Sequence, residues 1–228
     1  MDLEPLIMYG FDIFGTMIFA ITGAVRGVRS RLDFLGVLVM ACTVGVGGGI
    51  LRDLLLGATP VNAYMDETYL IVCIITGIMV FFMAPKVVGR WQIITICDAI
   101  GLGVFTALGV AKGQQYGVSH IGVVLSGVFT AVGGGVIRDI MVGTIPVVLM
   151  SDFYATASLI GGVVYLLLYS TGIPLYICVP LCAIVVTGLR LLAIHFHIHL
   201  PVANSWATLP GDVDLNANRS MDVSPKKR

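Results

Sequence analysis

Residues Thr43 to Pro60 read TVGVGGGILRDLLLGATP, a hydrophobic segment that contains three consecutive glycines followed by an Arg-Asp pair. The same pattern recurs at Phe129 to Pro146, which read FTAVGGGVIRDIMVGTIP. The offset between the copies is constant: Arg138 follows Arg52 by 138 − 52 = 86 residues, and the glycines, aspartates and final prolines keep that distance. Self-similarity at a fixed period indicates an internal duplication.

The duplication reaches well beyond this motif and contains no gap. At the same offset Asp12 matches Asp98, and Gly36 matches Gly122. A hydrophobic segment and a polar tail follow the second copy. We therefore predict two repeats, one further helix and a tail, with boundaries at residues 5–86, 91–170, 174–195 and 201–228.

The composition identifies the environment of the chain. Of its 228 residues, 57% are hydrophobic and only 11% are charged, and the mean hydropathy is +0.99. A soluble domain carries about a quarter charged residues, so the sequence predicts an all-α integral membrane protein. The formal net charge is +0 and no basic stripe is present, so nucleic acid is not an expected partner.

Seven segments are apolar and close to the length of about 20 residues that a membrane-spanning helix needs. They are Pro5–Val25, Phe34–Leu56, Thr68–Ala84, Trp91–Ala111, Ile121–Val142, Phe153–Ser170 and Pro174–Ile194. The tail, residues 201–228, is rich in Asp, Asn, Ser and Pro and is predicted to be disordered.

The basic residues of the loops predict the orientation. Lys and Arg gather in the first loop, the third loop and the end of the tail, whereas the second loop carries Asp66 and Glu67. Cytoplasmic loops are enriched in Lys and Arg. The N-terminus is therefore expected outside and the tail in the cytoplasm. Lys112, in the fourth loop, does not follow this pattern.

Each repeat contains three predicted spans. An odd number of crossings makes the second repeat enter the membrane upside down relative to the first. Inverted repeats of this kind occur in many transporters, whose working sites lie near the middle of the bilayer, at interrupted helices in corresponding positions. The sequence therefore predicts two inverted three-helix repeats followed by a seventh helix.

The two glycine triplets, residues 47–49 and 133–135, have two explanations. Each glycine in a helix interior is less favourable than alanine by about 1 kcal/mol, so a triplet favours a break in the helix that lines a pathway. The alternative is close helix packing, for which membrane proteins use small residues. A nucleotide-binding loop is excluded, because no strand precedes the glycines.

Six ionisable residues lie inside apolar segments or at their ends, where such residues indicate function by default. They are Asp12, Arg52, Asp53, Asp98, Arg138 and Asp139. Their depths along the spans predict that Asp12 lies near the Arg52-Asp53 pair, and Asp98 near the Arg138-Asp139 pair. We predict an intramembrane charge network; ion pairs that only fix the helix register are the alternative.

Catalysis and metal binding are not expected. The Ser, His and Asp residues show no spacing typical of a nucleophile, base and acid, so the chain is not predicted to be an enzyme. His195, His197 and His199 alternate with apolar residues, and in a helix only the first and last of them share a face. A metal site there is the less favoured interpretation, and no cofactor is predicted.

The doubled VGGGxxRD motif and the 3 + 3 + 1 arrangement of spans resemble the prokaryotic trimeric intracellular cation (TRIC) channels, whose bacterial members carry a domain named for glycine transport. The resemblance covers residues 5–195. It implies a homotrimer in membrane lipid, in the plasma (inner) membrane of a prokaryote. Each protomer would contain one pore, lined by broken second and fifth helices and permeable to potassium and other monovalent cations. The basic lipid-associated motif of the animal members has no recognisable counterpart here.

In such a pore, glycine carbonyl groups and nearby hydroxyl groups would replace part of the hydration shell of the ion. The predicted pathway residues are Thr43, Gly47, Gly48, Gly49, Ser126, Thr130, Gly133, Gly134 and Gly135. Permeant K+ or Na+ is the only bound species expected. The alternative function is a carrier for glycine or another small neutral amino acid, whose carboxylate favours a half-helix N-terminus.

Overall fold

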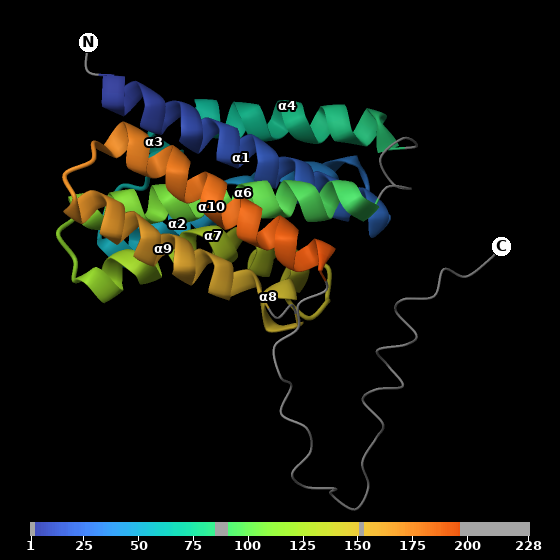
Figure 1. The fold of residues 1–228 in the computed structure, drawn as a ribbon. Helices are drawn as coiled ribbons and strands as arrows, with labels where there is room; N and C mark the ends of the chain where they lie inside the picture. Colours follow the sequence, from blue (N-terminus) through green and yellow to red (C-terminus); the bar gives the residue numbers. More distant parts are fainter. Residues whose placement is uncertain (1–2, 85–90, 151–152, 197–228) are drawn as a thin grey trace, which may run out of the picture.

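The computed structural model describes residues 3–84, 91–150 and 153–196, and Figure 1 shows a bundle of helices joined by short connections. These ranges contain no strand. The helices are α1 (Leu3–Arg29), α2 (Phe34–Leu56), α3 (Asn62–Met65), α4 (Thr68–Phe82), α6 (Trp91–Gln115), α7 (His120–Met141), α8 (Val147–Met150), α9 (Tyr154–Ser170) and α10 (Leu175–His195). The tail at residues 201–228, with His197 and His199, lies outside the described residues.

Each of the seven predicted spans coincides with a long helix. Five of these, namely α1, α2, α6, α7 and α10, are long and apolar enough to cross a membrane. The other two are shorter, with 15 residues in α4 and 17 in α9. At 1.5 Å per residue α4 is roughly 22 Å long, which is less than the hydrocarbon thickness of about 30 Å. It ends at Phe82, two residues before the predicted Ala84.

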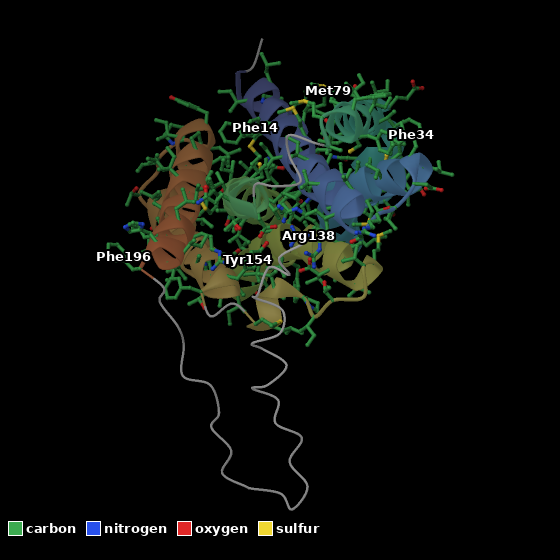
Figure 2. All side chains as sticks on the ribbon, turned by 90° about the vertical axis from the view of Figure 1, so that its right-hand side faces the viewer. Phe14, Phe34, Met79, Arg138, Tyr154 and Phe196 are labelled. Atoms are coloured by element: carbon green, nitrogen blue, oxygen red, sulfur yellow. The ribbon has the colours of Figure 1, made fainter. Side chains whose placement is uncertain are left out.

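Helix α6 lies at the centre of the bundle. It packs against α1, α7, α9 and α10, and the view along the helices in Figure 2 shows the others around it. Labelled apolar side chains such as Phe14, Met79 and Phe196 lie at the rim, and all three are well exposed. An exposed apolar rim around a buried, partly charged interior is the pattern expected of a protein whose solvent is lipid.

Corresponding helices of the two repeats run in opposite directions. Figure 1 shows α1 antiparallel to α6 and α2 antiparallel to α7, with the short helices α3 and α8 at opposite ends of the bundle. The helix starts also correspond. Asp33 caps α2 by accepting a hydrogen bond from the Gly36 amide (2.7 Å), and Ser119 caps α7 by accepting one from the Gly122 amide (3.2 Å).

The predicted break at the glycine triplets is wrong. Helices α2 and α7 run unbroken through residues 47–49 and 133–135. Backbone groups freed by a break in hydrocarbon would need new partners, and the continuous helices keep these groups in their own hydrogen-bonded turns. The triplets therefore do not expose a row of free carbonyl groups.

The middle glycines are instead where α2 and α7 cross. A Cβ atom at Gly48 would overlap the carbonyl oxygen of Thr130, and one at Gly134 would lie 2.8 Å from the carbonyl oxygen of Val44. At the offset of 86 these two contacts are equivalent, since Thr130 corresponds to Val44. The backbone of each helix thus contacts the backbone of the other at its middle glycine, and this close approach leaves no room for a side chain.

The same reciprocity holds for glycines elsewhere in the bundle. A Cβ atom at Gly23 would lie 2.5 Å from the carbonyl oxygen of Met40, and one at Gly109 would lie 2.5 Å from that of Ser126. Met40 and Ser126 are again 86 residues apart. The two repeats therefore fold with matching internal contacts.

Candidate functional site

A first cluster of buried polar side chains consists of Asp12, Arg52, Asp53, Tyr69 and Lys112. Arg52 Nη2 lies 3.6 Å from Asp12 Oδ2, and Arg52 Nε donates to Asp53 Oδ1 at 2.8 Å. The Tyr69 hydroxyl donates to Asp12 Oδ2 at 3.0 Å. Helices α1, α2, α4 and α6 each contribute to this cluster.

A second cluster repeats this arrangement in the other half, with Asp98, Arg138, Asp139, Tyr154 and Arg190. Arg138 Nη1 donates to Asp98 Oδ1 at 2.5 Å, and Arg138 Nε donates to Asp139 Oδ1 at 2.9 Å. The Arg190 guanidinium carbon lies 5.1 Å from the centre of the Tyr154 ring. Figure 2 shows Arg138 and Tyr154 inside the bundle. Both pairings expected from the sequence, Asp12 with Arg52 and Asp98 with Arg138, are therefore present.

Each cluster contains two acidic and two basic side chains. Buried charges are tolerated where they are paired and hydrogen-bonded, because an isolated charge in a low dielectric loses its hydration without compensation. Arg52 and Arg138 are 3% and 2% exposed, so neither relies on water. A functional role for the two clusters remains a prediction.

Lys112 belongs to the first cluster but was not among the residues predicted for it. Its Nζ lies 2.7 Å from Asp53 Oδ1, so a cation that seemed to contradict the loop charges is half of an ion pair between α6 and α2. The duplication could have revealed it, because Lys112 corresponds to Arg26 at the offset of 86. Arg26 reaches the other repeat in the same way, with Nη2 3.1 Å from Thr144 Oγ1.

The aspartate of each Arg-Asp pair also holds the chain beyond its helix. The second oxygen of Asp53 accepts from the Asn62 amide at 3.1 Å, and that of Asp139 accepts from the Val147 amide at 2.9 Å. Between them the chain turns at Gly57 and Gly143, with φ of 70° and 69°, a conformation that glycine adopts without strain. The segment from the Arg-Asp pair to the proline thus forms the same turn after α2 and after α7, and the aspartate holds it in place.

A cavity of about 460 Å³ opens onto the first cluster. Its lining combines apolar, polar and charged side chains: Pro5, Met8, Tyr9, Asp12, Arg52, Asn62, Tyr69, Leu108, Lys112, Gln115 and Leu175. A second, smaller cavity of about 10 Å³ shares Asp12, Arg52 and Tyr69 with it, and its lining also includes Thr16, Gly45, Gly49 and Phe105. That volume accommodates about one water molecule.

The predicted pathway residues are distributed over several environments. Gly49 lines the smaller cavity, and a Cβ atom there would lie 3.8 Å from Arg52 Nη2. Gly135 faces Arg138 Nη2 at the same distance in the second cluster. Gly47 packs against Ile137, and Gly133 packs against Leu51, which is the repeat equivalent of Ile137. Only the third glycine of each triplet therefore faces a charged cluster.

The predicted hydroxyl ligands are engaged within their own helix. Ser126 Oγ donates to the Gly122 carbonyl at 2.8 Å, and Thr130 Oγ1 donates to the Ser126 carbonyl at 2.5 Å. Both lie where α7 packs on Gly109 of α6. Thr43 is half-buried on α2. Neither of the two cavities described above is lined by any of the three, so their role in an ion pathway remains a prediction.

Two further polar residues lie near the ends of the bundle. Asp66, in the connection before α4, accepts hydrogen bonds from the Thr68 amide (2.9 Å) and the Tyr9 hydroxyl (2.6 Å). Hydrogen bonds from Thr68 and then Tyr9 lower the pKa of Asp66. At the end of α10, His195 packs edge-on against Phe196.

Comparison with known proteins shows the family. The glycine transporter family model matches residues 9–85 and 95–170. The chain is 39% identical over 201 residues to a UPF0126 membrane protein of Vibrio cholerae, covering 87% of this chain and 84% of the relative. It is 37% identical over 199 residues to the UPF0126 inner membrane protein YadS of Escherichia coli K12, covering 86% and 96%.

Among solved structures, the TRIC trimeric intracellular cation channel orthologue from Rhodobacter sphaeroides superposes with a TM-score of 0.81 at 31% identity, covering 84% of this chain and 99% of that one. The all-helical fold is thus the fold of TRIC channels, and with its apolar helices and inner-membrane relatives the chain is a multi-pass bacterial inner-membrane protein. The chain therefore belongs to the prokaryotic TRIC family, which the glycine transporter model describes.

Proposed function

We propose that the protein is a cation channel permeable to potassium and other monovalent cations, with one pathway inside each protomer. The observation that carries this proposal is the pair of cavities beside the first cluster, within a single chain, which share Asp12, Arg52 and Tyr69 in their linings. The description of the Rhodobacter sphaeroides protein as a cation channel supports the same class of function.

The lining favours cations that keep part of their hydration shell. Asp12 and the Tyr69 hydroxyl supply oxygen atoms to both cavities, and the Thr16 hydroxyl supplies one to the smaller cavity. Because α2 is unbroken, its glycine carbonyl groups accept hydrogen bonds within the helix, so side-chain oxygens rather than free carbonyls coordinate the ion. The third glycines, Gly49 and Gly135, leave room beside the two arginines.

The proposal includes a topology of seven crossings, with the N-terminus outside and the C-terminus in the cytoplasm. The opposite directions of α1 and α6 and of α2 and α7 support two inverted repeats, as do the reciprocal glycine contacts. Helix α4 is short for a bilayer, but α3 precedes it almost directly, and together they span Asn62 to Phe82. K+ and Na+ are the proposed bound species.

A homotrimer embedded in membrane lipid is the proposed assembly. The Rhodobacter sphaeroides orthologue is described as trimeric, and 99% of that chain is covered by this one. Large apolar side chains such as Leu54, Ile121 and Ile184 are more than half exposed, which fits contact with lipid or with other copies of the chain.

A carrier for glycine or a similar small amino acid is the second candidate. The larger cavity favours it specifically, because about 460 Å³ exceeds the needs of a bare ion and Asp12, Arg52 and Lys112 offer charges of both signs to a zwitterion. Proteoliposomes distinguish the two functions. A channel predicts rapid K+ efflux that does not saturate with glycine, whereas saturable, exchange-stimulated uptake of labelled glycine without K+ efflux would favour the carrier.

A further inference from the structure

The two repeats differ at two positions that line the smaller cavity. In the first repeat this cavity is lined by Thr16 and Gly45. Their equivalents at the offset of 86 are Leu102 and Ala131, which add apolar volume in the second repeat. Both are fully buried in the main hydrophobic core, together with Phe19 and Phe105. The second repeat therefore carries larger and more apolar residues than the first at these two positions.

An aromatic pair that the duplication also relates lies beside this cavity. Phe105 lines the cavity and packs against Phe19, its repeat equivalent, with ring centroids 5.0 Å apart. Each ring fills the space beside a glycine of the opposite repeat: Phe19 lies against Gly101 and Gly134, and Phe105 lies against Gly15. The pair therefore packs at the interface between the two repeats.

We propose that Leu102, with Phe19 and Phe105, forms the apolar seal that closes the ion pathway in this conformation, a proposal that rests on the channel function above. Apolar constrictions stop ions by excluding water, so a closed pore needs no direct block. Thr16 provides a hydroxyl on the side where the cavity is open, and Leu102 presents only methyl groups at the matching position in α6. The departure from internal symmetry thus identifies the residue that holds the pathway closed.

The test replaces Leu102 with the residue that the other repeat carries. Full-length Leu102→Thr protein is reconstituted in planar bilayers in KCl, beside the parent chain. We expect the open probability to rise by about tenfold, because a hydroxyl in the seal lowers the free energy of hydrating it. Leu102→Ala, which shortens the seal without adding a polar atom, should give a smaller increase in the same direction.

Val110→Thr is the matched control. Val110 is also fully buried on α6 and packs against Gly127, so the change adds a hydroxyl to the same helix away from the cavity. It should leave the open probability at the parent value. Thr16→Leu extends the apolar lining into the cavity and should lower the current.

The outcomes separate the seal from the channel function. Leu102→Thr and Leu102→Ala proteins that assemble like the parent and keep its open probability would overturn the seal while leaving the channel intact. An increase shared by Val110→Thr would also overturn it, since the effect would then come from general loosening of α6. If neither the parent nor any variant passes unitary currents, the channel function itself is contradicted and the seal with it.

Discussion

The ammonium group of Lys112, in the last turn of α6, lies 2.7 Å from Oδ1 of Asp53 in α2. A cation of the second repeat thereby neutralises an acid of the first, at the edge of the larger cavity. Asp53 also binds Arg52 and the amide of Asn62, so a single carboxylate joins α2, α3 and α6. The ion pair thus couples the two halves of the bundle at one end of the proposed pathway.

Removal of Lys112 leaves Asp53 with one cation fewer. We expect Lys112→Gln and Asp53→Asn each to lower the free energy of unfolding by roughly 1–3 kcal/mol, the usual range for a buried group that loses its partner. The double variant should lose less than the sum of the two. Thermal unfolding of the purified protein in detergent measures all four corners of this cycle, and strict additivity would show that the pair is not coupled.

The ion pair of the second cluster is more deeply buried than the pair of Lys112 and Asp53, so the loss of one partner should lower the free energy of unfolding by more. Asp98→Asn and Arg138→Gln each leave a charge without its main partner, and in buried sites this destabilises by roughly 3–5 kcal/mol. Combining them should restore part of the loss. The same unfolding assay checks this, and single variants as stable as the parent would contradict a structural role for the pair.

Alanine substitutions at two adjacent glycines of the first triplet, Gly48 and Gly49, are expected to have different effects. A methyl group at Gly48 overlaps the Thr130 carbonyl, so Gly48→Ala must push α2 from α7 and should lower the unfolding temperature clearly. At Gly49 the nearest atom to a new methyl group, apart from the backbone of its own helix, is Arg52 Nη2 at 3.8 Å, so Gly49→Ala should fold normally. Because Gly49 lines the cavity, its variant should instead reduce K+ flux.

Gly134→Ala repeats the test of the crossing position in the other half, since a methyl group there would lie 2.8 Å from the Val44 carbonyl oxygen. A Gly48→Ala protein with parental stability, or a Gly49→Ala protein that unfolds early, would show that the assignment of crossing and lining positions is reversed. Both readouts come from one preparation, with unfolding followed in detergent and flux followed in liposomes.

The positions of the helices and the buried ion pairs could be predicted from the sequence, whereas the role of the glycine triplets and the partner of Lys112 could not. Helix positions were predictable because a bilayer demands long apolar runs, and the duplication supplies six of the seven as three pairs. The pairing of Asp98 with Arg138 followed from their depths. The predicted glycine break is wrong, because the continuous helices keep their backbone groups hydrogen-bonded and the glycines serve the close crossing of α2 and α7 instead. Lys112 was missed because its chemistry depends on a contact with the other repeat.

The pH dependence of one exposed contact follows from the lowered pKa of Asp66. Hydrogen bonds from Thr68 and Tyr9 favour its ionised form in the folded protein, compared with an ordinary value of 3.8 in the unfolded chain. This contribution to stability is therefore fully present above the unfolded pKa and is lost as the pH falls through the lower folded pKa. Asp66→Asn should flatten the fall of the unfolding temperature below about pH 4, relative to the parent. An equally steep fall in the variant would assign the effect to other groups.

The most direct measurement of the central claim is the current through single molecules of the parent protein in a planar bilayer. An open pore conducts without a conformational cycle for each ion, so discrete unitary steps should appear and should reverse near the potassium equilibrium potential in a KCl gradient. A carrier rearranges for each substrate, over microseconds to seconds, which is too slow for resolvable steps. Correctly folded protein that takes up glycine but shows no unitary K+ current would contradict the account.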